Sequence, residues 1–165
     1  MQSYYEKNRE DNQSLEYKRS TNHSYPPHFH LNLEIFLLDR GEYEITVNDN
    51  KYTVTDGDIV VFDSYDIHSY ERKSVPKAGG NDGLLVIPYR YLTRFNGWRK
   101  NFRITTPIIR NERLCAELLA LADKYLIGET DERVKESALD LLLARLLESL
   151  QFSESKTKDE GMLRH

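Results

Sequence analysis

The stretch HFHLNLEIFLLDRG, residues 28–41, decides how the rest of the sequence is interpreted. Its centre, Leu31 to Leu38, is an apolar run of strand length, and the turn residues 39–41 (DRG) end it. Side chains at even spacing lie on the same face of a strand. If the strand is continuous from residue 28, one face carries His28, His30, Glu34 and Phe36, and the other carries Phe29, Leu31, Leu33, Ile35 and Leu37. The sequence therefore predicts one polar, chemistry-bearing face and one apolar packing face.

The polar face has the residue types of a metal site. His28, His30 and Glu34 supply two imidazoles and a carboxylate, and His68 from a later strand adds a third imidazole. Such nitrogen and oxygen ligands suit Zn, Ni, Mn, Cu or Fe. We therefore treat these four residues as a candidate 3-His-1-carboxylate site. His23 has no partners at metal-ligand spacing, and we expect it at the surface.

Short β-type runs continue after this strand, with turn signals between them. They are residues 43–47 (YEITV), 51–55 (KYTVT), 58–62 (DIVVF), 67–71 (IHSYE) and 83–87 (GLLVI). The turn at 48–50 predicts a hairpin between the first two runs. Many short strands at this spacing indicate a sandwich or a small barrel rather than a parallel α/β sheet. We expect the barrel to span residues 14–106.

A leucine-rich helical pattern follows over residues 111–151. Asn111 is the expected N-cap of a first helix, Gly128 breaks the pattern, and Thr130 precedes a second helix. The second helix is apolar on two sides, one with Val134, Ala138, Leu141, Leu142 and Leu146, and the other with Leu139, Leu143, Leu147 and Leu150. A helix that is apolar all round needs cover on more than one face. We expect residues 107–152 to form an antiparallel hairpin that makes a homodimer; the alternative is that both faces are buried within one chain.

Composition narrows the class of protein. The 165 residues suit one domain, and a formal net charge of −4 argues against this chain holding nucleic-acid phosphates by itself. No apolar run approaches the roughly 18 residues of a membrane span. The single cysteine, Cys115, lies in an apolar helical stretch, which predicts a buried thiol and a cytoplasmic location. Residues 1–13 are polar, and we expect a flexible N-terminal arm there.

These motifs resemble those of the cupin superfamily. The first motif of that family is matched by His28, His30, Glu34 and Gly41 at the family's spacing, although its earlier glycine is Asn22 here. The second motif begins at Gly57 and ends at His68, but its usual proline and glycine are Asp63 and Tyr65, and its final asparagine is Arg72. The resemblance implies a mainly β fold, a cupin double-stranded β-helix (jelly-roll barrel), followed here by the two-helix hairpin.

A narrower resemblance covers most of the chain. The order HFH, E and G, then TDGDIVVFDSYDIHSY, then LLVIPYRYLTRF and two leucine-rich helices is similar to the N-terminal effector domain of AraC-type transcription regulators. That resemblance implies a barrel that binds a small molecule, a hairpin that mediates dimerisation, and a helix-turn-helix domain that contacts DNA. The last of these is absent from the sequence, so residues 153–165 are expected to be the interdomain linker of a truncated protein.

Three interpretations of the polar face stay open at this point. His28, His30, Glu34, Phe36 and His68 could bind an effector such as a sugar or a related polar metabolite, with no cofactor required. The four metal-ligating types among them could instead hold a divalent metal such as Zn, Ni, Mn or Fe, which would also suit a cupin dioxygenase or isomerase. Finally, the barrel could be filled by its own side chains. The absence of a second acid–base cluster in the sequence favours a sensor that is not an enzyme.

Overall fold

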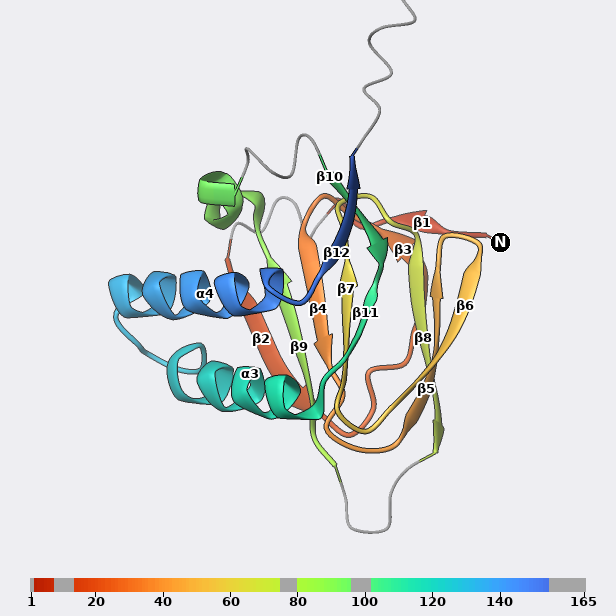
Figure 1. Ribbon diagram of the computed structural model, residues 1–165, viewed down its shortest axis with the longest axis horizontal. Coiled ribbons are helices and arrows are strands. Elements are labelled where there is room, and N and C mark those ends of the chain that lie inside the picture. The colour runs from red at the N-terminus through yellow and green to blue at the C-terminus, as the bar shows by residue number, and fades with distance from the viewer. Residues whose placement is uncertain (1, 8–13, 75–79, 96–101, 155–165) are drawn as a thin grey trace, which may run out of the picture.

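The computed structural model describes residues 2–7, 14–74, 80–95 and 102–154. Two five-stranded sheets face each other, and two helices cover the outer face of one of them (Figure 1). The predicted mainly β architecture with a C-terminal pair of helices is therefore confirmed. The five β-runs expected from the sequence all form strands, and the predicted hairpin joins β5 to β6.

The first sheet has the order β1-β3-β8-β5-β6. Its strands are β1 (Tyr4–Tyr5), β3 (Tyr25–Phe29), β8 (His68–Ser74), β5 (Glu42–Val47) and β6 (Asn50–Thr55). The second sheet has the order β11-β7-β4-β9-β2. Its strands are β11 (Ile108–Arg110), β7 (Asp58–Phe62), β4 (Leu33–Leu37), β9 (Asp82–Ile87) and β2 (Glu16–Ser20).

The side chains of the central strand β4 point alternately into two hydrophobic cores. Leu33, Ile35 and Leu37 belong to the core between the second sheet and the helices. Phe36 belongs to the core between the two sheets, together with the aromatic side chains of Tyr43 and Phe62. The strand begins at Leu33, however, and is not continuous from residue 28, because residues 30–32 leave the ladder. The even-numbered side chains still face the space between the sheets, so the predicted polar face survives the break.

The two helices form an antiparallel hairpin against the second sheet (Figure 1). Helix α3 (Glu112–Tyr125) is capped by Asn111, whose side chain accepts a hydrogen bond from the backbone nitrogen of Leu114. Helix α4 (Glu132–Leu147) is capped by Asp131. Between them Gly128 adopts a φ of 76°, a left-handed conformation that favours glycine. None of the helices in the described segments is long and apolar enough to cross a membrane.

Three predicted boundaries differ from the structure. The expected flexible arm contains β1, which pairs in parallel with β3, so at least Tyr4 and Tyr5 are held by backbone hydrogen bonds. The barrel does not end at residue 106, because β11 pairs with β7 in the second sheet. The expected linker overlaps β12 (Gln151–Glu154), which pairs with β10 (Phe102–Thr106) in a separate two-stranded sheet. A 3₁₀ helix, η1 (Tyr89–Phe95), follows β9.

Candidate functional site

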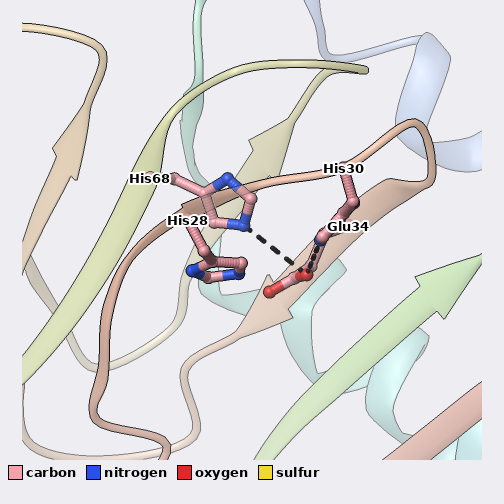
Figure 2. Close-up of side chains that lie close together, drawn as sticks. All are labelled: His28, His30, Glu34 and His68. Atoms are coloured by element: carbon pink, nitrogen blue, oxygen red, sulfur yellow. Dashed lines mark hydrogen bonds and ion pairs between the residues drawn. The ribbon is translucent and has the colours of Figure 1, made fainter. Parts of the chain in front are cut away.

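The four predicted metal-ligating residues meet between the two sheets. His28 comes from the end of β3, His30 from the segment after it, Glu34 from β4 and His68 from the start of β8. One nitrogen or oxygen atom from each lies within 4.8 Å of those from all the others. Each residue is only 1% exposed. Figure 2 shows the three rings converging on the Glu34 carboxylate, and we call these four residues the histidine cluster.

Backbone carbonyl groups orient the three rings in the same way. The Nδ1 atoms of His28, His30 and His68 lie 2.8, 3.1 and 2.8 Å from carbonyl oxygens two residues away, those of Pro26, Asn32 and Asp66. A carbonyl oxygen only accepts a hydrogen bond, so each Nδ1 carries the proton. Each Nε2 is therefore left for the interior of the cluster, which is how histidines that bind metals are commonly fixed.

Glu34 provides the negative charge of the cluster. Its Oε2 lies 2.8 Å from Nε2 of His30 and 3.5 Å from Nε2 of His68, and its Oε1 accepts a hydrogen bond from the Tyr70 hydroxyl. Among the described residues, Nε2 of His28 and Nε2 of His68 have no hydrogen-bond partner although both are buried. Buried polar atoms without partners are rare in native proteins and indicate a missing ligand, water or ion.

The cluster perturbs the pKa values of its members in opposite directions. Burial would raise the pKa of Glu34, but His68 and His30 beside it lower that pKa well below its usual range. Burial, with His68 nearby, lowers the pKa of His28 to about 4. Burial would also lower the pKa of His68, yet the Glu34 carboxylate outweighs this effect and raises it. At neutral pH the cluster therefore holds a carboxylate next to a neutral His28 ring.

The donor set fits a divalent cation. Ligand atoms bound at about 2.1 Å to one tetrahedral or octahedral ion lie roughly 3.0–3.5 Å from their neighbours. The two distances from Glu34 Oε2 to imidazole nitrogens, 2.8 and 3.5 Å, are close to this range. A bare Nε2 lone pair also repels a carboxylate, and a cation or a proton between them removes this repulsion. His28, His30, Glu34 and His68 are the residues that would hold such an ion.

A cavity of about 300 Å³ opens beside the cluster, between β2 and β3. It is lined by Lys18, Arg19, Ser20, Asn22, His23, Ser24, Tyr25, His28, Glu34, Tyr70 and Leu84. Of the five residues predicted to bind a ligand, His28 and Glu34 line it, whereas His30 and His68 do not. Phe36 is fully buried against Tyr43 and Tyr70 and does not line the cavity either. Its role in ligand binding stays a prediction.

Sequence reasoning missed two residues around the cluster. Tyr70 lies two positions after His68 on β8, so the same alternation that placed His68 could have identified it. His23, expected at the surface, is buried: its Nε2 lies 2.9 Å from the Asp82 carbonyl oxygen, and its ring packs edge-on against Phe36. No local signal could have found this contact, because its partner lies 59 residues away.

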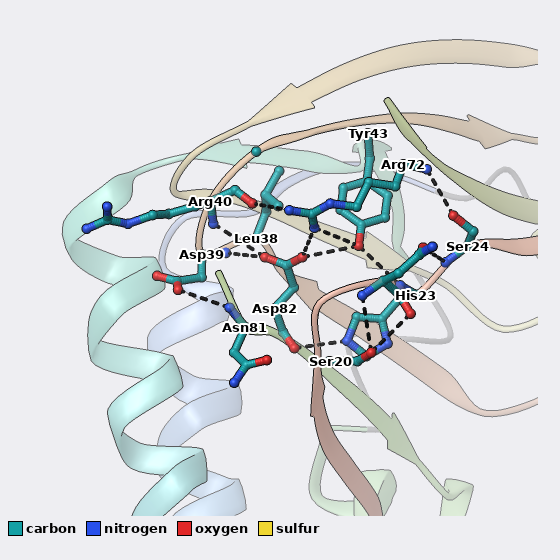
Figure 3. Close-up of polar contacts among 12 residues, drawn as sticks. Ser20, His23, Ser24, Leu38, Asp39, Arg40, Tyr43, Arg72, Asn81 and Asp82 are labelled. Atoms are coloured by element: carbon teal, nitrogen blue, oxygen red, sulfur yellow. Dashed lines mark hydrogen bonds and ion pairs between the residues drawn. The ribbon is translucent and has the colours of Figure 1, made fainter. Parts of the chain in front are cut away.

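A second polar network is centred on Asp82, at the start of β9 (Figure 3). The buried carboxylate of Asp82 forms an ion pair with Arg72 and accepts hydrogen bonds from the Tyr43 hydroxyl, at 3.1 Å, and the Asp39 backbone nitrogen, at 2.9 Å. Arg72 also donates to the carbonyl oxygen of Arg40, at 3.0 Å. The network thus joins β8, β9 and the turn after β4. It also reaches the cavity lining at His23, whose backbone nitrogen donates to the Tyr43 hydroxyl at 3.1 Å.

The region that resembles the second cupin motif forms its turns with residues that depart from the family's pattern. Tyr65 stands where the family has glycine, and it adopts a left-handed φ of 64°. The Asp66 carboxylate holds this turn by accepting a hydrogen bond from the Asp63 backbone nitrogen at 3.0 Å. Gly57, which begins the motif, has a φ of 80°, and a Cβ there would lie 2.8 Å from Cα of Glu112. Arg72 replaces the final asparagine and forms the buried ion pair described above.

This arrangement defines a class of protein: a small β-barrel with a polar pocket inside and a helical hairpin outside, built to bind a ligand. The chain belongs to the family of AraC-like ligand binding domains, whose family model it matches over residues 12–161. Family and fold therefore confirm the predicted resemblance to the N-terminal cupin domain of AraC-type regulators. A comparison with curated protein sequences found no match.

Solved structures with this fold include two regulators. An apo form of ToxT from Vibrio cholerae has a TM-score of 0.54 at 10% identity, over 81% of this chain and 55% of that one. The AraC-like transcriptional activator CuxR has a TM-score of 0.54 at 11% identity, over 78% and 46%. ToxT bound to an unsaturated fatty acid gives 0.54 at 13%, over 83% and 54%. The chain spans about half the length of these regulators, and at such identities the likeness shows the fold alone.

Proposed function

We propose that this chain senses a small polar molecule, such as a sugar or a related metabolite, in the cavity between β2 and β3. One observation carries the proposal: the lining combines His28 and Glu34 with the hydroxyl and amide groups of Ser20, Asn22 and Ser24. These groups offer both hydrogen-bond donors and acceptors, which a polyhydroxylated ligand requires. A volume of about 300 Å³ lies at the lower end of the roughly 300–1,000 Å³ typical of ligand pockets.

The lining also favours a polar ligand over a long apolar chain. Leu84 is the one aliphatic side chain among the residues that line the cavity. ToxT has been captured with an unsaturated fatty acid, and such a ligand needs extended apolar walls. The space between the sheets that could supply such walls is filled by Phe36, Phe62 and Tyr43. We therefore infer a compact, hydrogen-bonding effector for this chain.

Effector binding would act on transcription through parts beyond this chain. In an AraC-type regulator, binding of the effector would shift the populations of the protein's conformations. This shift would change which DNA sites the attached helix-turn-helix domain can reach. DNA is then a partner through that domain alone, and the protein would work in the cytoplasm. The family is defined by ligand binding, which supports a role without catalysis, in preference to a metal-dependent cupin dioxygenase or isomerase.

A thermal-shift screen followed by calorimetry tests the effector proposal. Sugars, sugar acids and fatty acids are added with and without a chelator, since a ligand that binds the folded state raises Tm. We expect a sugar or sugar acid to raise Tm, and Asn22→Ala, which removes a lining amide, to weaken its Kd by about tenfold. Thr21→Ala, next to it and also exposed but not lining the cavity, is the matched control. A shift with fatty acids alone would contradict a polar effector.

The histidine cluster supports a second proposal, that it binds one divalent metal such as Zn, Ni, Mn or Fe. Its support is that three Nδ1 atoms are committed to carbonyl groups while two buried Nε2 atoms lack partners. A bound metal would act as a Lewis acid that polarises ligand oxygens. Elemental analysis of protein purified without nickel resin, then supplied with each metal, tests this proposal. Less than about a tenth of an equivalent for every metal would contradict it.

We further propose that the chain forms a homodimer through its helices. A groove of about 650 Å³ on the hairpin is lined by Leu121, Tyr125, Asp131, Arg133, Val134, Ser137, Ala138 and Leu141. Val134 and Leu141 are 40% and 52% exposed, and both of these apolar side chains line the groove. Most apolar residues on both predicted sides are buried within the chain, which is the alternative that the sequence left open: Ala138, Leu142 and Leu146 on one side, and Leu139, Leu143 and Leu150 on the other. Val134 and Leu141 are the exposed apolar side chains of α4 that a second copy could cover.

A further inference from the structure

A second carboxylate, that of Glu6, reaches the histidine cluster from the beginning of the chain. Strand β1 places Tyr4 opposite His28 on β3, and the backbone nitrogen of Glu6 then donates to the carbonyl oxygen of Phe29 at 3.0 Å. The Glu6 side chain is 9% exposed, so the carboxylate is largely removed from solvent. A carboxylate is seldom buried unless a proton donor or a cation accompanies it.

Two tyrosine hydroxyls hold one oxygen of this carboxylate. Tyr25 and Tyr4 donate to Oε1 of Glu6 at 2.7 and 3.2 Å. Both rings also contact His28, with centroids 4.7 and 6.0 Å from the imidazole. The tyrosines therefore fix the carboxylate next to the ring, and the second oxygen, Oε2, lies 4.0 Å from His28 Nε2.

The distance between these two atoms is too long for a hydrogen bond and leaves room for an ion-bound water. His28 Nε2 has no hydrogen-bond partner among the described residues. Glu6 is not one of the four residues whose ligand atoms all lie within 4.8 Å of one another, so its carboxylate lies just outside the cluster. An ion-bound water that donates to the carboxylate would span this gap. The ion itself would then give the buried His28 nitrogen a partner.

Charge balance supports the same conclusion. Imidazoles protonated on Nδ1 alone are neutral, so the ligating state of the cluster has a single charged group, Glu34. A divalent cation on these four residues would keep one uncompensated positive charge in a buried site. The Glu6 carboxylate, 4.0 Å from His28 Nε2, places a second negative charge beside the site.

We propose that Glu6 is a further anionic group of the cation site, so that a divalent metal held by the histidine cluster fastens β1 to the barrel. The inference rests on the proposed metal site. It adds a fifth residue to the site, through an ion-bound water, and it couples metal binding to the order of the N-terminal strand.

Calorimetry and hydrogen exchange on the same samples test the inference. Zn²⁺, Ni²⁺ or Mn²⁺ is titrated into metal-free protein, and exchange is followed in a peptide that contains residues 4–6. We expect metal to slow exchange at the Glu6 amide by about tenfold, because opening β1 would then require loss of an ion contact. Glu6→Gln keeps an oxygen that can accept from Tyr25 and Tyr4 but removes the charge. It should weaken metal Kd by about tenfold or more and abolish the metal-dependent protection.

The controls separate this inference from the metal proposal. Glu71→Gln removes an exposed carboxylate on the outer part of β8 and should leave both readouts unchanged. If the wild-type protein binds one equivalent of metal, but exchange at residues 4–6 and the Kd of Glu6→Gln are unaltered, the Glu6 inference is overturned while the metal site stands. If no metal binds to the wild-type protein, both fail.

A second variant covers the case in which Glu6→Gln does not fold. Tyr25→Phe keeps the ring against His28 but removes the hydroxyl that holds Glu6 Oε1 at 2.7 Å. It should reduce metal-dependent protection of the Glu6 amide with a smaller loss of metal affinity than Glu6→Gln. Unchanged protection in a folded Tyr25→Phe protein would count against the proposal.

Discussion

The Glu34 carboxylate is shared by three neighbours that come from two other parts of the chain. His30 precedes β4, whereas His68 and Tyr70 belong to β8 in the facing sheet. The carboxylate therefore links the two sheets in the interior of the barrel, where few hydrogen bonds from water can replace it. Burial alone would raise the pKa of Glu34 and lower that of His68; the attraction between the carboxylate and the His68 ring outweighs burial in both, so the pKa of Glu34 is low and that of His68 is raised.

The first prediction follows from this shared carboxylate. Glu34→Gln in metal-free protein should lower the free energy of unfolding by about 2–4 kcal/mol, because His68 loses its anionic partner inside the barrel. Urea unfolding at pH 7 measures the change. Glu44→Gln, which removes a surface ion pair to Lys51 of 3.4 Å, should cost less than about 1 kcal/mol. Equal effects of the two substitutions would show that the Glu34 carboxylate contributes no more to the free energy of unfolding than a surface carboxylate does.

The single thiol gives a second prediction at this scale. Burial, with Asp39 and Asp58 nearby, raises the pKa of Cys115 to about 12. A thiol reacts as its thiolate, so the native protein should be inert to a disulfide reagent at pH 8 and should react fully once unfolded in urea. Because the folded pKa is the higher one, stability should be lost as pH rises above about 8.5, where the unfolded thiol begins to ionise. Rapid reaction of the native protein would refute this.

At the scale of elements, alternation along β4 predicted which of its side chains face the polar groups and which face apolar packing. Glu34 lies among the polar groups, and Ile35 packs in a hydrophobic core, which the structure places against the helices. The pairing of β3 with β8, which brings His28 opposite His68, could only follow from the family resemblance, because strand partners are not encoded in local periodicity. The position of the cavity could not be predicted from the sequence either, because it lies between strands of different sheets.

Strands with atypical composition were not identified from the sequence. Strand β3 contains Pro26 and Pro27, which lack the amide hydrogen that a ladder uses, and its register with β8 shifts between Tyr25 and His28. Strand β2 reads EYKRS and lies at the edge of its sheet, where charged side chains are common. Both strands line the cavity, so the part of the fold that was hardest to predict is the part that shapes the proposed binding site.

The third prediction belongs to the network that ties these elements together. Arg72→Met or Asp82→Asn should each lower the free energy of unfolding by about 3–5 kcal/mol, because either change leaves the partner buried without its counterion. In a double-mutant cycle the combined loss should be clearly smaller than the sum of the two single losses. Urea unfolding of the four proteins measures this. Additive losses would show that the interaction between Arg72 and Asp82, which joins β8 to β9, does not contribute to the free energy of unfolding.

At the scale of the whole molecule, the site and the hairpin share the second sheet. Glu34 on β4 faces the cavity, and the adjacent Ile35 packs in the core that includes Leu118 of α3 and Leu142 of α4. A shift of β4 on ligand binding would therefore displace the helices, because the core between them is close-packed. This arrangement gives the proposed dimer a physical connection to the proposed effector.

The last prediction tests that dimer. Leu141→Glu puts a charge into the apolar groove and should raise the dimer Kd by at least about 30-fold, corresponding to about 2 kcal/mol for a residue central to an interface. Sedimentation velocity over a range of concentrations measures the change. Leu141 is 52% exposed in one chain, so the variant should keep its fold and its Tm as a monomer. Ile127→Glu, at an apolar residue that is 48% exposed and does not line the groove, is the matched control and should leave the Kd unchanged. A wild-type chain that stays monomeric at high concentration would exclude the dimer, and dissociation by Ile127→Glu alone would move the interface away from the groove.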